Sequence, residues 1–362
     1  MQIIEDRRAL HQIPELDRDL PETMAYLRRG LEPLGCQVFS PMEGALCAYF
    51  DFGADSTIAF RSDADALPIT ERSDAAYRSC HVGKMHACGH DGHMAIALEL
   101  ARRMDKKQCL ERNVLIVFQP AEETTGGARD LCDTGVFLNY NVEAIFGLHL
   151  WPGVAAGEIF SRANEMMSRS CEVKVKITGK SAHIAKAYEG IDAMAAGVVF
   201  YQKVRELEQA LPPEIFRILS FGKFQSGTVC NAVAGETVLE GTLRAFQDEV
   251  FFHLRDGIRT IGQEIAATTG CIVDIHMNDG YPAVMNPPAL YDKIRGMVDF
   301  HELPVPSMIT EDFSWYQRHL EGLFFFLGIG DSPALHADNF DFPEEILVKG
   351  AEFFEKIAEA YR

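Results

Sequence analysis

The sequence predicts an α/β protein whose main domain is interrupted by a smaller α+β domain. Three observations support this fold class. The first 167 residues alternate short apolar strands with amphipathic helices, and the same alternation returns after about residue 280. Between these parts, strands with a period-two pattern of apolar and polar residues replace the apolar ones. A chain of 362 residues is also long for a single hydrophobic core.

The first part of the chain supplies four apolar strands and four helices. The strands are expected at 45–52, 57–64, 113–121 and 142–150, and the helices at 4–16, 20–35, 92–106 and 126–137. Apolar strands that alternate with helices indicate a mostly parallel sheet covered on both faces.

The middle part follows the order of a ferredoxin-like unit, βαββαβ. Its strands are expected at 170–179, 216–227, 235–246 and 271–280, and its helices at 190–211 and 248–270. The last part returns to α/β character, with helices at 289–301 and 344–362 and a buried strand at 322–330. We therefore expect one domain formed by residues 1–167 and 280–362, and an inserted domain formed by residues 168–279. An active site is expected between them, at the carboxyl ends of the parallel strands.

The overall charge restricts the partners. The 53 acidic and 34 basic residues give a formal net charge of −19. This argues against nucleic acid and anionic membrane as partners, because both need a basic surface. No apolar run has the length of a membrane span, and the N-terminus lacks the apolar core of a signal peptide. A cytoplasmic location is therefore expected, and the nine cysteines, with no C-x-x-C pair, are expected to be reduced.

Side chains that could bind a metal ion stand at the ends of the predicted parallel strands. They are Asp63 and Asp65 after the second strand, Glu122 and Glu123 after the third, His149 at the end of the fourth, and His336 after the last. The stretch HACGHDGH, residues 86–93, lies between the first two of these groups. Because the carboxyl ends of parallel strands meet at one edge of a sheet, we expect these five segments to converge.

These residue types suit a borderline-soft divalent ion such as zinc, although imidazole and carboxylate also accept manganese, cobalt or nickel. In an extended HACGH, residues 86, 88 and 90 would share one face, and Gly89 would allow a tight bend. Asp91 is expected to cap the helix that follows. On an extended segment, Glu122 and Glu123 would point to opposite sides. One carboxylate could then bind metal while the other acts as a general base toward water.

Each of these residues also has a plainer interpretation. A pair of glutamates is often a solvated surface pair, His149 beside Trp151 could be a core histidine, and His336 could belong to an ordinary loop. Histidines in helical or ordinary strand contexts are interpreted as structural: His11, His253, His276, His301 and His319. The shared position of the candidates at strand ends is what favours a metal site.

Nine motifs together resemble the M20 metallopeptidase family, and within it the aminoacylase-like amidohydrolase branch. In chain order they are RSDADALPI, MHACGHDGHMA, FQPAEE, GLHLWPG, GKSAHIA, SGTVCNAV, GTLRAF, TEDFSWY and SPALHADN. They cover nearly the whole chain. The resemblance implies a catalytic α/β domain that binds two divalent metal ions, with an inserted ferredoxin-like lid that often mediates formation of a homodimer.

The resemblance also implies roles for individual residues. The metal ligands would be Cys88, His90, Glu123, His149 and His336, with Cys88 bridging the two ions. Glu122 would be the general base that activates the water, and Asp65 would orient a ligand imidazole through its carboxylate. Elsewhere in the wider family a histidine ligand stands where Asp63 is, so Asp63 is interpreted as a structural or supporting residue.

In the inserted domain, the resemblance assigns His183 to the residue that polarises the scissile carbonyl, for its own or the neighbouring subunit. Asn231 and Arg244 match positions suited to holding a substrate carboxylate, the arginine through a two-point fork. The segment after His183 departs from the family. The usual pattern is closer to HAAxPH, whereas this chain has HIAKAYEG.

The predicted activity is metal-dependent hydrolysis of the amide bond of N-acyl amino acids, which releases a carboxylic acid and a free amino acid. Alternatives within the family are N-acetyl-diaminopimelate deacetylase, suggested by LGIGDSPALH and FGKFQSGT, and a dipeptidase or carboxypeptidase-like specificity. A non-catalytic metal-binding protein of this fold would lack the base or a ligand, and neither is missing. A thiol redox protein using Cys88 would need a resolving cysteine at motif spacing, and none is present.

Overall fold

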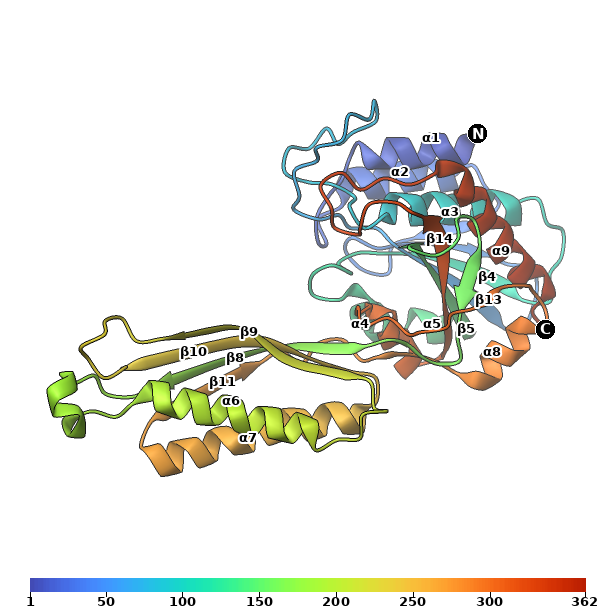
Figure 1. Ribbon diagram of the computed structural model, residues 1–362. Helices are drawn as coiled ribbons and strands as arrows, with labels where there is room; N and C mark the ends of the chain where they lie inside the picture. Colours follow the sequence, from blue (N-terminus) through green and yellow to red (C-terminus); the bar gives the residue numbers. More distant parts are fainter. The chain divides into compact units, whose positions relative to one another are not determined.

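The computed structural model describes residues 1–362 and divides the chain into two compact units (Figure 1). The first unit comprises Met1–Met166, Met285–Pro306 and Asp312–Arg362, and the second comprises Met167–Val284 and Ser307–Glu311. The sequence places Ser307–Glu311 in the first domain, whereas here it groups with the second unit. The reason is local, because the backbone N–H of Ser168 donates to the carbonyls of Ser307 and Ile309 at 3.0 and 3.1 Å.

The first unit is built on an eight-stranded sheet with the order β1-β2-β4-β3-β5-β14-β6-β13. The strands are β1 (Gln37–Phe39), β2 (Leu46–Phe50), β3 (Thr57–Asp63), β4 (Asn113–Gln119), β5 (Val142–Pro152), β6 (Ile159–Ser161), β13 (His301–Glu302) and β14 (Glu321–Gly330). Strands β4, β3, β5 and β14 are parallel neighbours at the centre. All residues of β3 and β4 are buried, as expected for central strands with both faces covered. The predicted α/β fold class is confirmed.

Helices cover both faces of this sheet (Figure 1). The helices of the first unit are α1 (Gln2–His11), α2 (Pro21–Leu31), α3 (His90–Met104), α4 (Gly127–Asp133), α5 (Val136–Asn139), α8 (Pro288–Arg295) and α9 (Leu347–Ala360), with the 3-10 helices η2 (Asp312–Arg318) and η3 (Glu344–Ile346). Phe324 of β14 contacts Phe313 of η2 on one face, with ring centroids 4.9 Å apart. Its neighbour Phe325 points to the opposite face and contacts Phe353 of α9 at 4.8 Å.

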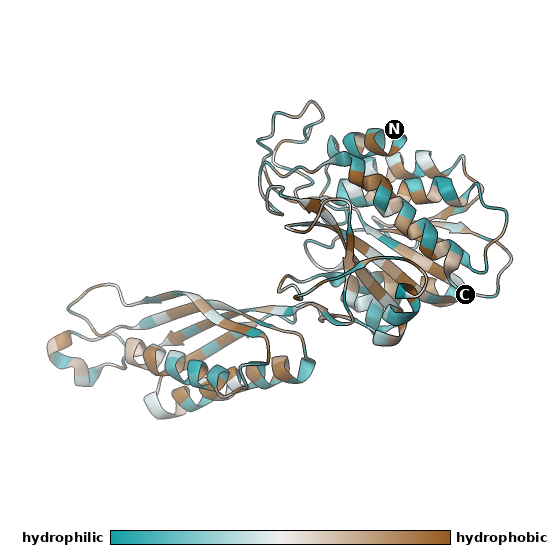
Figure 2. Ribbon diagram, turned by 45° about the vertical axis from the view of Figure 1, so that its right-hand side comes forward, coloured by the Kyte–Doolittle hydropathy of each residue, from teal (hydrophilic) through white to brown (hydrophobic).

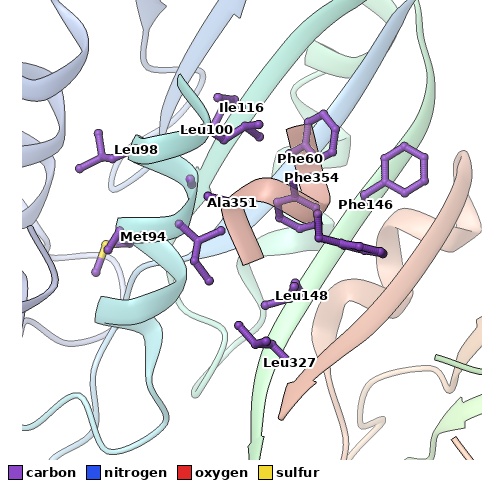
Figure 3. Packing of buried hydrophobic residues seen from close by; sticks show 14 of the residues in the cluster. Phe60, Met94, Leu98, Leu100, Ile116, Phe146, Leu148, Leu327, Ala351 and Phe354 are labelled. Atoms are coloured by element: carbon purple, nitrogen blue, oxygen red, sulfur yellow. The ribbon is translucent and has the colours of Figure 1, made fainter. Parts of the chain in front are cut away.

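The hydrophobic core of the first unit lies between the sheet and helices α3 and α9 (Figure 3). The ring of Phe60 in β3 lies 4.9 Å from that of Phe354 in α9, and Met94 and Leu98 project from α3. Burial of one such side chain contributes about 1.5–3 kcal/mol. Figure 2 shows the hydrophobic residues concentrated on the strands. This packing fixes α3, and with it the residues at its N-terminus.

The second unit has the predicted βαββαβ order: β8 (Arg169–Thr178), α6 (Ala193–Gln209), β9 (Arg217–Ser226), β10 (Glu236–Ala245), α7 (Asp248–Thr269) and β11 (Ile272–Met277). Its antiparallel sheet has the order β11-β8-β10-β9, and both helices lie on the same side of it (Figure 1). The alternating burial of β8 follows from this, because Val173, Val175 and Ile177 face the helices. The 3-10 helix η1 (Ile184–Glu189) precedes α6.

A short two-stranded sheet pairs β7 (Asn164–Met167) with β12 (Val284–Asn286). No helix of the chain has both the length and the apolar character needed to cross a membrane.

Candidate metal centre

The candidate ligands meet at the carboxyl edge of the parallel strands. Cys88 and His90 lie where the chain enters α3, Glu123 follows β4, His149 lies in β5, and His336 follows β14. Cys88 Sγ lies 3.4 Å from His149 Nε2, and His336 Nε2 lies 3.2 Å from Glu123 Oε1. His90 Nε2 is 3.9 Å from the same Glu123 oxygen. The structure therefore brings all five predicted ligands together.

Two overlapping groups of donor atoms have the geometry of metal sites. The donors of Cys88, His90 and His149 lie within 4.8 Å of one another, and so do those of Cys88, Glu123 and His336. Cys88 belongs to both groups, so its thiolate could contribute to both sites. Thiolate, imidazole and carboxylate together form a suitable donor set for zinc-like ions.

The two buried imidazoles are oriented for metal binding. The Nδ1 atoms of His90 and His149 lie 2.8 and 2.7 Å from the backbone carbonyls of Asp65 and Leu150. A carbonyl can only accept, so each Nδ1 carries the proton and each Nε2 offers a lone pair. His90 Nε2 is buried and has no hydrogen-bond partner. Such an orphaned polar atom is costly, and a divalent ion would satisfy it.

Burial shifts the pKa values of this cluster. It raises the pKa of the Cys88 thiol well above its usual range, helped by the charges of Glu123 and Glu122. It lowers the pKa of His149 well below its usual range and also lowers that of His90, so both rings are neutral near pH 7. A bound divalent ion would favour the thiolate, because a coordinating thiol loses its proton.

In the Glu123–His336 pair, contact between the two side chains outweighs the effect of burial on their pKa values. Burial raises the pKa of Glu123, but the hydrogen bond from His336 and nearby imidazoles outweigh it, so the net shift is downward. The same hydrogen bond raises the pKa of His336. This carboxylate is thus charged and available as a ligand.

Asp65 positions the two glutamates. Its carboxylate accepts the backbone N–H groups of Glu122 and Glu123 at 3.0 and 3.1 Å. The sequence predicts that this carboxylate orients a ligand imidazole, but the carbonyl of Asp65 makes that contact with His90, and the carboxylate stays 3.8 Å from the ring. Asp65 therefore links the turn that carries Glu122 to the ring of His90.

Two local expectations are wrong and a third is confirmed in part. Residues 122–125 form a turn after Ala121, which has φ +60°, and are not extended. The stretch HACGH bends at Gly89, which has φ +84°, as predicted for this glycine, and it enters α3 there, so the stretch is not extended. Asp91 makes no capping hydrogen bond, since its carboxylate pairs with Arg7 and His11 instead. Long-range ionic partners outweigh the local capping preference at this position.

Asp63 and His93 support the centre and already have partners. The N–H of Leu150 donates to His93 Nε2 at 2.9 Å, so His93 Nδ1 is protonated and donates to Asp63 at 2.6 Å. Asp63 also pairs with Arg61 at 2.7 Å. His86 is buried but belongs to none of the donor groups, and its ring centroid lies 6.5 Å from that of His11.

Sequence reasoning missed Arg7, and it interpreted His11 as a structural histidine without identifying its partners. Both are buried in α1 and contact Asp91, the residue after His90. The signal was present, since Arg7 and His11 are four residues apart and therefore share one helical face with apolar residues.

The predicted substrate residues lie in the second unit. His183 is exposed, and its Nδ1 accepts the N–H of Ala185 at 3.2 Å, which leaves Nε2–H as a donor. Asn231 is a neighbour, because its carbonyl accepts the N–H of Ile184 at 2.9 Å. Arg244 lies near the far end of β10 and donates to the carbonyl of Met308.

The length of β10 separates these residues. The backbone of His183 forms an isolated β-bridge with that of Ala232, just before β10 begins, whereas Arg244 is the penultimate residue of β10. A ten-residue strand spans roughly 30 Å. The structure thus brings His183 and Asn231 together but keeps Arg244 of the same subunit far from both, so Asn231 and Arg244 of one chain cannot hold the same carboxylate.

Comparisons with known proteins agree with this architecture. Residues 59–360 match the model of peptidase family M20/M25/M40. The chain is 34% identical over 374 residues to an uncharacterized hydrolase of Staphylococcus haemolyticus, covering 99% of this chain and 98% of that protein. It resembles the crystal structure of the Bacillus subtilis YXEP protein, described as a dinuclear metal-binding peptidase of the M20 family, with a TM-score of 0.84 and 28% identity over 99% and 96% of the two chains. A protein of methicillin-resistant Staphylococcus aureus gives a TM-score of 0.91 at 27% identity, over 98% and 95%.

Proposed function

The chain belongs to peptidase family M20/M25/M40, and we propose that within this family it hydrolyses the amide bond of N-acyl amino acids. The family and the named relatives make it a metal-dependent hydrolase that binds two ions. The observation that carries the proposal is the position of Glu122. Its carboxylate lies within 4.8 Å of the donors of His90 and Glu123, beside both candidate ligand groups.

The residues divide the chemistry among them. Cys88, His90, Glu123, His149 and His336 would hold two divalent ions, which when bound lower the pKa of a water molecule and polarise the acyl carbonyl. Glu122, fixed through its backbone by Asp65, takes the proton of the attacking water and delivers it to the leaving amine.

Two residues of the second unit, His183 and Arg244, contact the substrate. His183 donates from Nε2 to the oxygen of the tetrahedral intermediate, where negative charge develops. The Arg244 fork holds the carboxylate of the amino acid. A substrate with a free carboxylate next to the scissile amide uses both contacts, and this favours N-acyl amino acids.

The test of the base is Glu122→Gln, with the exposed Glu345→Gln as a matched control. We expect kcat to fall by about 10²–10⁴-fold in the first variant, with both ions still bound, and no change in the second. Near-normal turnover of metal-loaded Glu122→Gln would exclude Glu122 as the base.

A hydrolysis panel tests the substrate. N-acetyl and N-benzoyl amino acids should be cleaved faster than dipeptides, whereas a preference for N-acetyl-diaminopimelate would identify the deacetylase alternative. Metal analysis of the purified protein addresses the ions. The thiolate of Cys88 favours zinc over harder ions such as manganese.

We also infer that the working enzyme is a homodimer formed through the second unit. His183 and Arg244 of one chain are too far apart to contact the same N-acyl amino acid, so a complete site needs His183 from a second copy. An exposed apolar stripe on α6, formed by Met194, Val198 and Tyr201, lies beside the edge strand β9. A second copy that pairs along β9 about a two-fold axis would cover both.

Mixing two inactive variants tests this arrangement. Equal amounts of His183→Ala and Arg244→Ala, exchanged into mixed dimers, should recover about a quarter of the wild-type activity, because half the dimers are mixed and each has one complete site. If both residues act within one chain, the mixture stays inactive. A monomer by sedimentation at working concentration would exclude the dimer.

A further inference from the structure

Helix α1 supplies no candidate metal ligand, yet it places a fully buried arginine beside the metal centre. The side chain of Arg7 has 0% of its surface exposed, and so does that of Asp91, its nearest partner. Arginine is almost never fully buried unless it is paired. The position of Arg7 therefore needs an explanation beyond the packing of a surface helix.

Arg7 contacts a different carboxylate through each of its three nitrogens. Nε donates to Asp91 at 2.8 Å, Nη2 to Asp341 at 3.0 Å and Nη1 to Glu344 at 3.2 Å. The guanidinium carbon lies 4.7 Å from the ring centroid of Tyr77 and 4.5 Å from that of Phe342. The hydroxyl of Tyr77 donates to the same Asp341 at 2.8 Å. Each of the three guanidinium nitrogens of Arg7 thus has a carboxylate partner.

These carboxylates belong to the two segments that carry ligands. Asp91 directly follows His90, and Asp341 lies five residues after His336. The backbone N–H of His336 donates to the carbonyl of Ala87 at 2.8 Å, so the two segments also touch at the ligands. His336 has φ +67°, a conformation that costs energy in a non-glycine residue and persists only where the surroundings hold it.

His11 reinforces the contact from the next turn of α1. Its Nδ1 lies 2.8 Å from Asp91 Oδ2, the oxygen that also accepts from Arg7. Its Nε2 lies 3.4 Å from Glu71, in the loop that leads to Cys88. Two donors on one oxygen fix the orientation of Asp91, and with it the first turn of α3.

We propose that Arg7 is a positioning residue for the metal centre, holding the segment that bears His336 against the segment that bears Cys88 and His90. This inference rests on the proposed function, because it takes these three residues as ligands. Stability alone does not explain Arg7. A buried ion pair is generally no more stabilising than apolar residues of similar volume. What a guanidinium adds is a rigid plane with donors in three directions, which fixes geometry.

The experiment compares metal binding by Arg7→Gln with that by Arg8→Gln. Arg8 is the neighbouring residue of α1, is half exposed and pairs with Glu344 alone, so it controls for a lost charge on this helix. Metal-free protein is titrated with Zn²⁺ in competition with a chromophoric chelator, and circular dichroism checks the fold. We expect Arg7→Gln to bind at least one ion about 10- to 100-fold more weakly, and Arg8→Gln to match the wild type.

Arg7→Lys provides a second variant if Arg7→Gln does not fold. It keeps the charge but loses the fork, so the same weakening is expected. Excess Zn²⁺ should restore activity to either folded variant, which a purely structural defect would not allow. Folded variants that bind both ions with wild-type affinity would overturn this inference alone. A wild-type protein that binds two ions and hydrolyses nothing in the panel would instead overturn the proposed substrate.

Discussion

Replacement of Asp65 by asparagine should disable the metal centre without removing any ligand. The Asp65 side chain is fully buried, and its two oxygens accept the N–H groups of Glu122 and Glu123 at 3.0 and 3.1 Å. Asparagine has nearly the same shape but keeps only one acceptor oxygen. Its NH₂ group would face one of the two backbone N–H groups, so one hydrogen bond is lost and two donors meet.

The magnitude follows from these contacts. A typical hydrogen bond contributes about 0.5–1.5 kcal/mol, and a buried donor without a partner costs about 1–3 kcal/mol. The two effects overlap, so the free energy of unfolding of metal-free protein should fall by about 2–4 kcal/mol. The turn that carries Glu122 should also shift, and a misplaced base lowers kcat by about 100-fold.

The assay pairs urea denaturation with turnover of an N-acyl amino acid. A matched control is Asp192→Asn in the second unit. Asp192 also accepts two backbone N–H groups, those of Met194 and Ala195, but it is an exposed helix cap, where asparagine is about as good as aspartate. The reasoning is refuted if Asp65→Asn loses less than about 0.5 kcal/mol, the range of an ordinary surface substitution, and keeps wild-type kcat.

Three further predictions concern pH, packing and metal. Burial lowers the pKa of His11, but the Asp91 carboxylate outweighs it and the pKa rises to about 9 from 6.5. His11 therefore contributes about 3 kcal/mol of stability below pH 6.5 that is lost as pH rises through 9, and the stability gap between wild type and His11→Asn should close over that range. Gly127→Ala should lower the free energy of unfolding by at least about 1–3 kcal/mol, since its Cβ would lie 2.0 Å from the carbonyl oxygen of Pro120. The control is Gly222→Ala, whose Cβ would meet nothing within 4 Å and which should change thermal stability little. Removal of the ions by a chelator should abolish activity and lower the melting temperature, because ions that bind only the folded state stabilise it. An unchanged melting temperature would contradict such binding.

The central strands and the convergence of the candidate ligands could be predicted because they depend on short-range patterns and on topology. Apolar runs such as residues 113–119 identify buried parallel strands, and parallel strands bring their carboxyl ends to one edge. His149 and His336 could therefore be placed near Glu123 without any knowledge of side-chain contacts. Strands β6 and β13 were missed, because three and two residues are too few to show a period.

The supporting contacts could not be predicted, because their partners are far apart in sequence. Arg7 and Asp91 are 84 residues apart, and Arg7 and Asp341 are 334 apart. Local rules make Asp91 a helix cap, and only the folded chain shows that an arginine and a histidine take its carboxylate. The turn at Glu122 was missed for the same reason, since Asp65, which follows β3, holds it from a distant part of the sequence.

The separation of His183 from Arg244 follows from one backbone pairing in the structure and from the length of a strand that the sequence predicts. Residues 235–246 are a strand in any ferredoxin-like arrangement, and a strand rises about 3.3 Å per residue. A residue that pairs just before this strand and one near its end must therefore lie roughly 30 Å apart, whatever the side chains do. If both contact one small substrate, they come from different chains. The inference of a two-subunit site thus depends on the length of one strand and not on any detail of side-chain placement. The mixing experiment tests it directly.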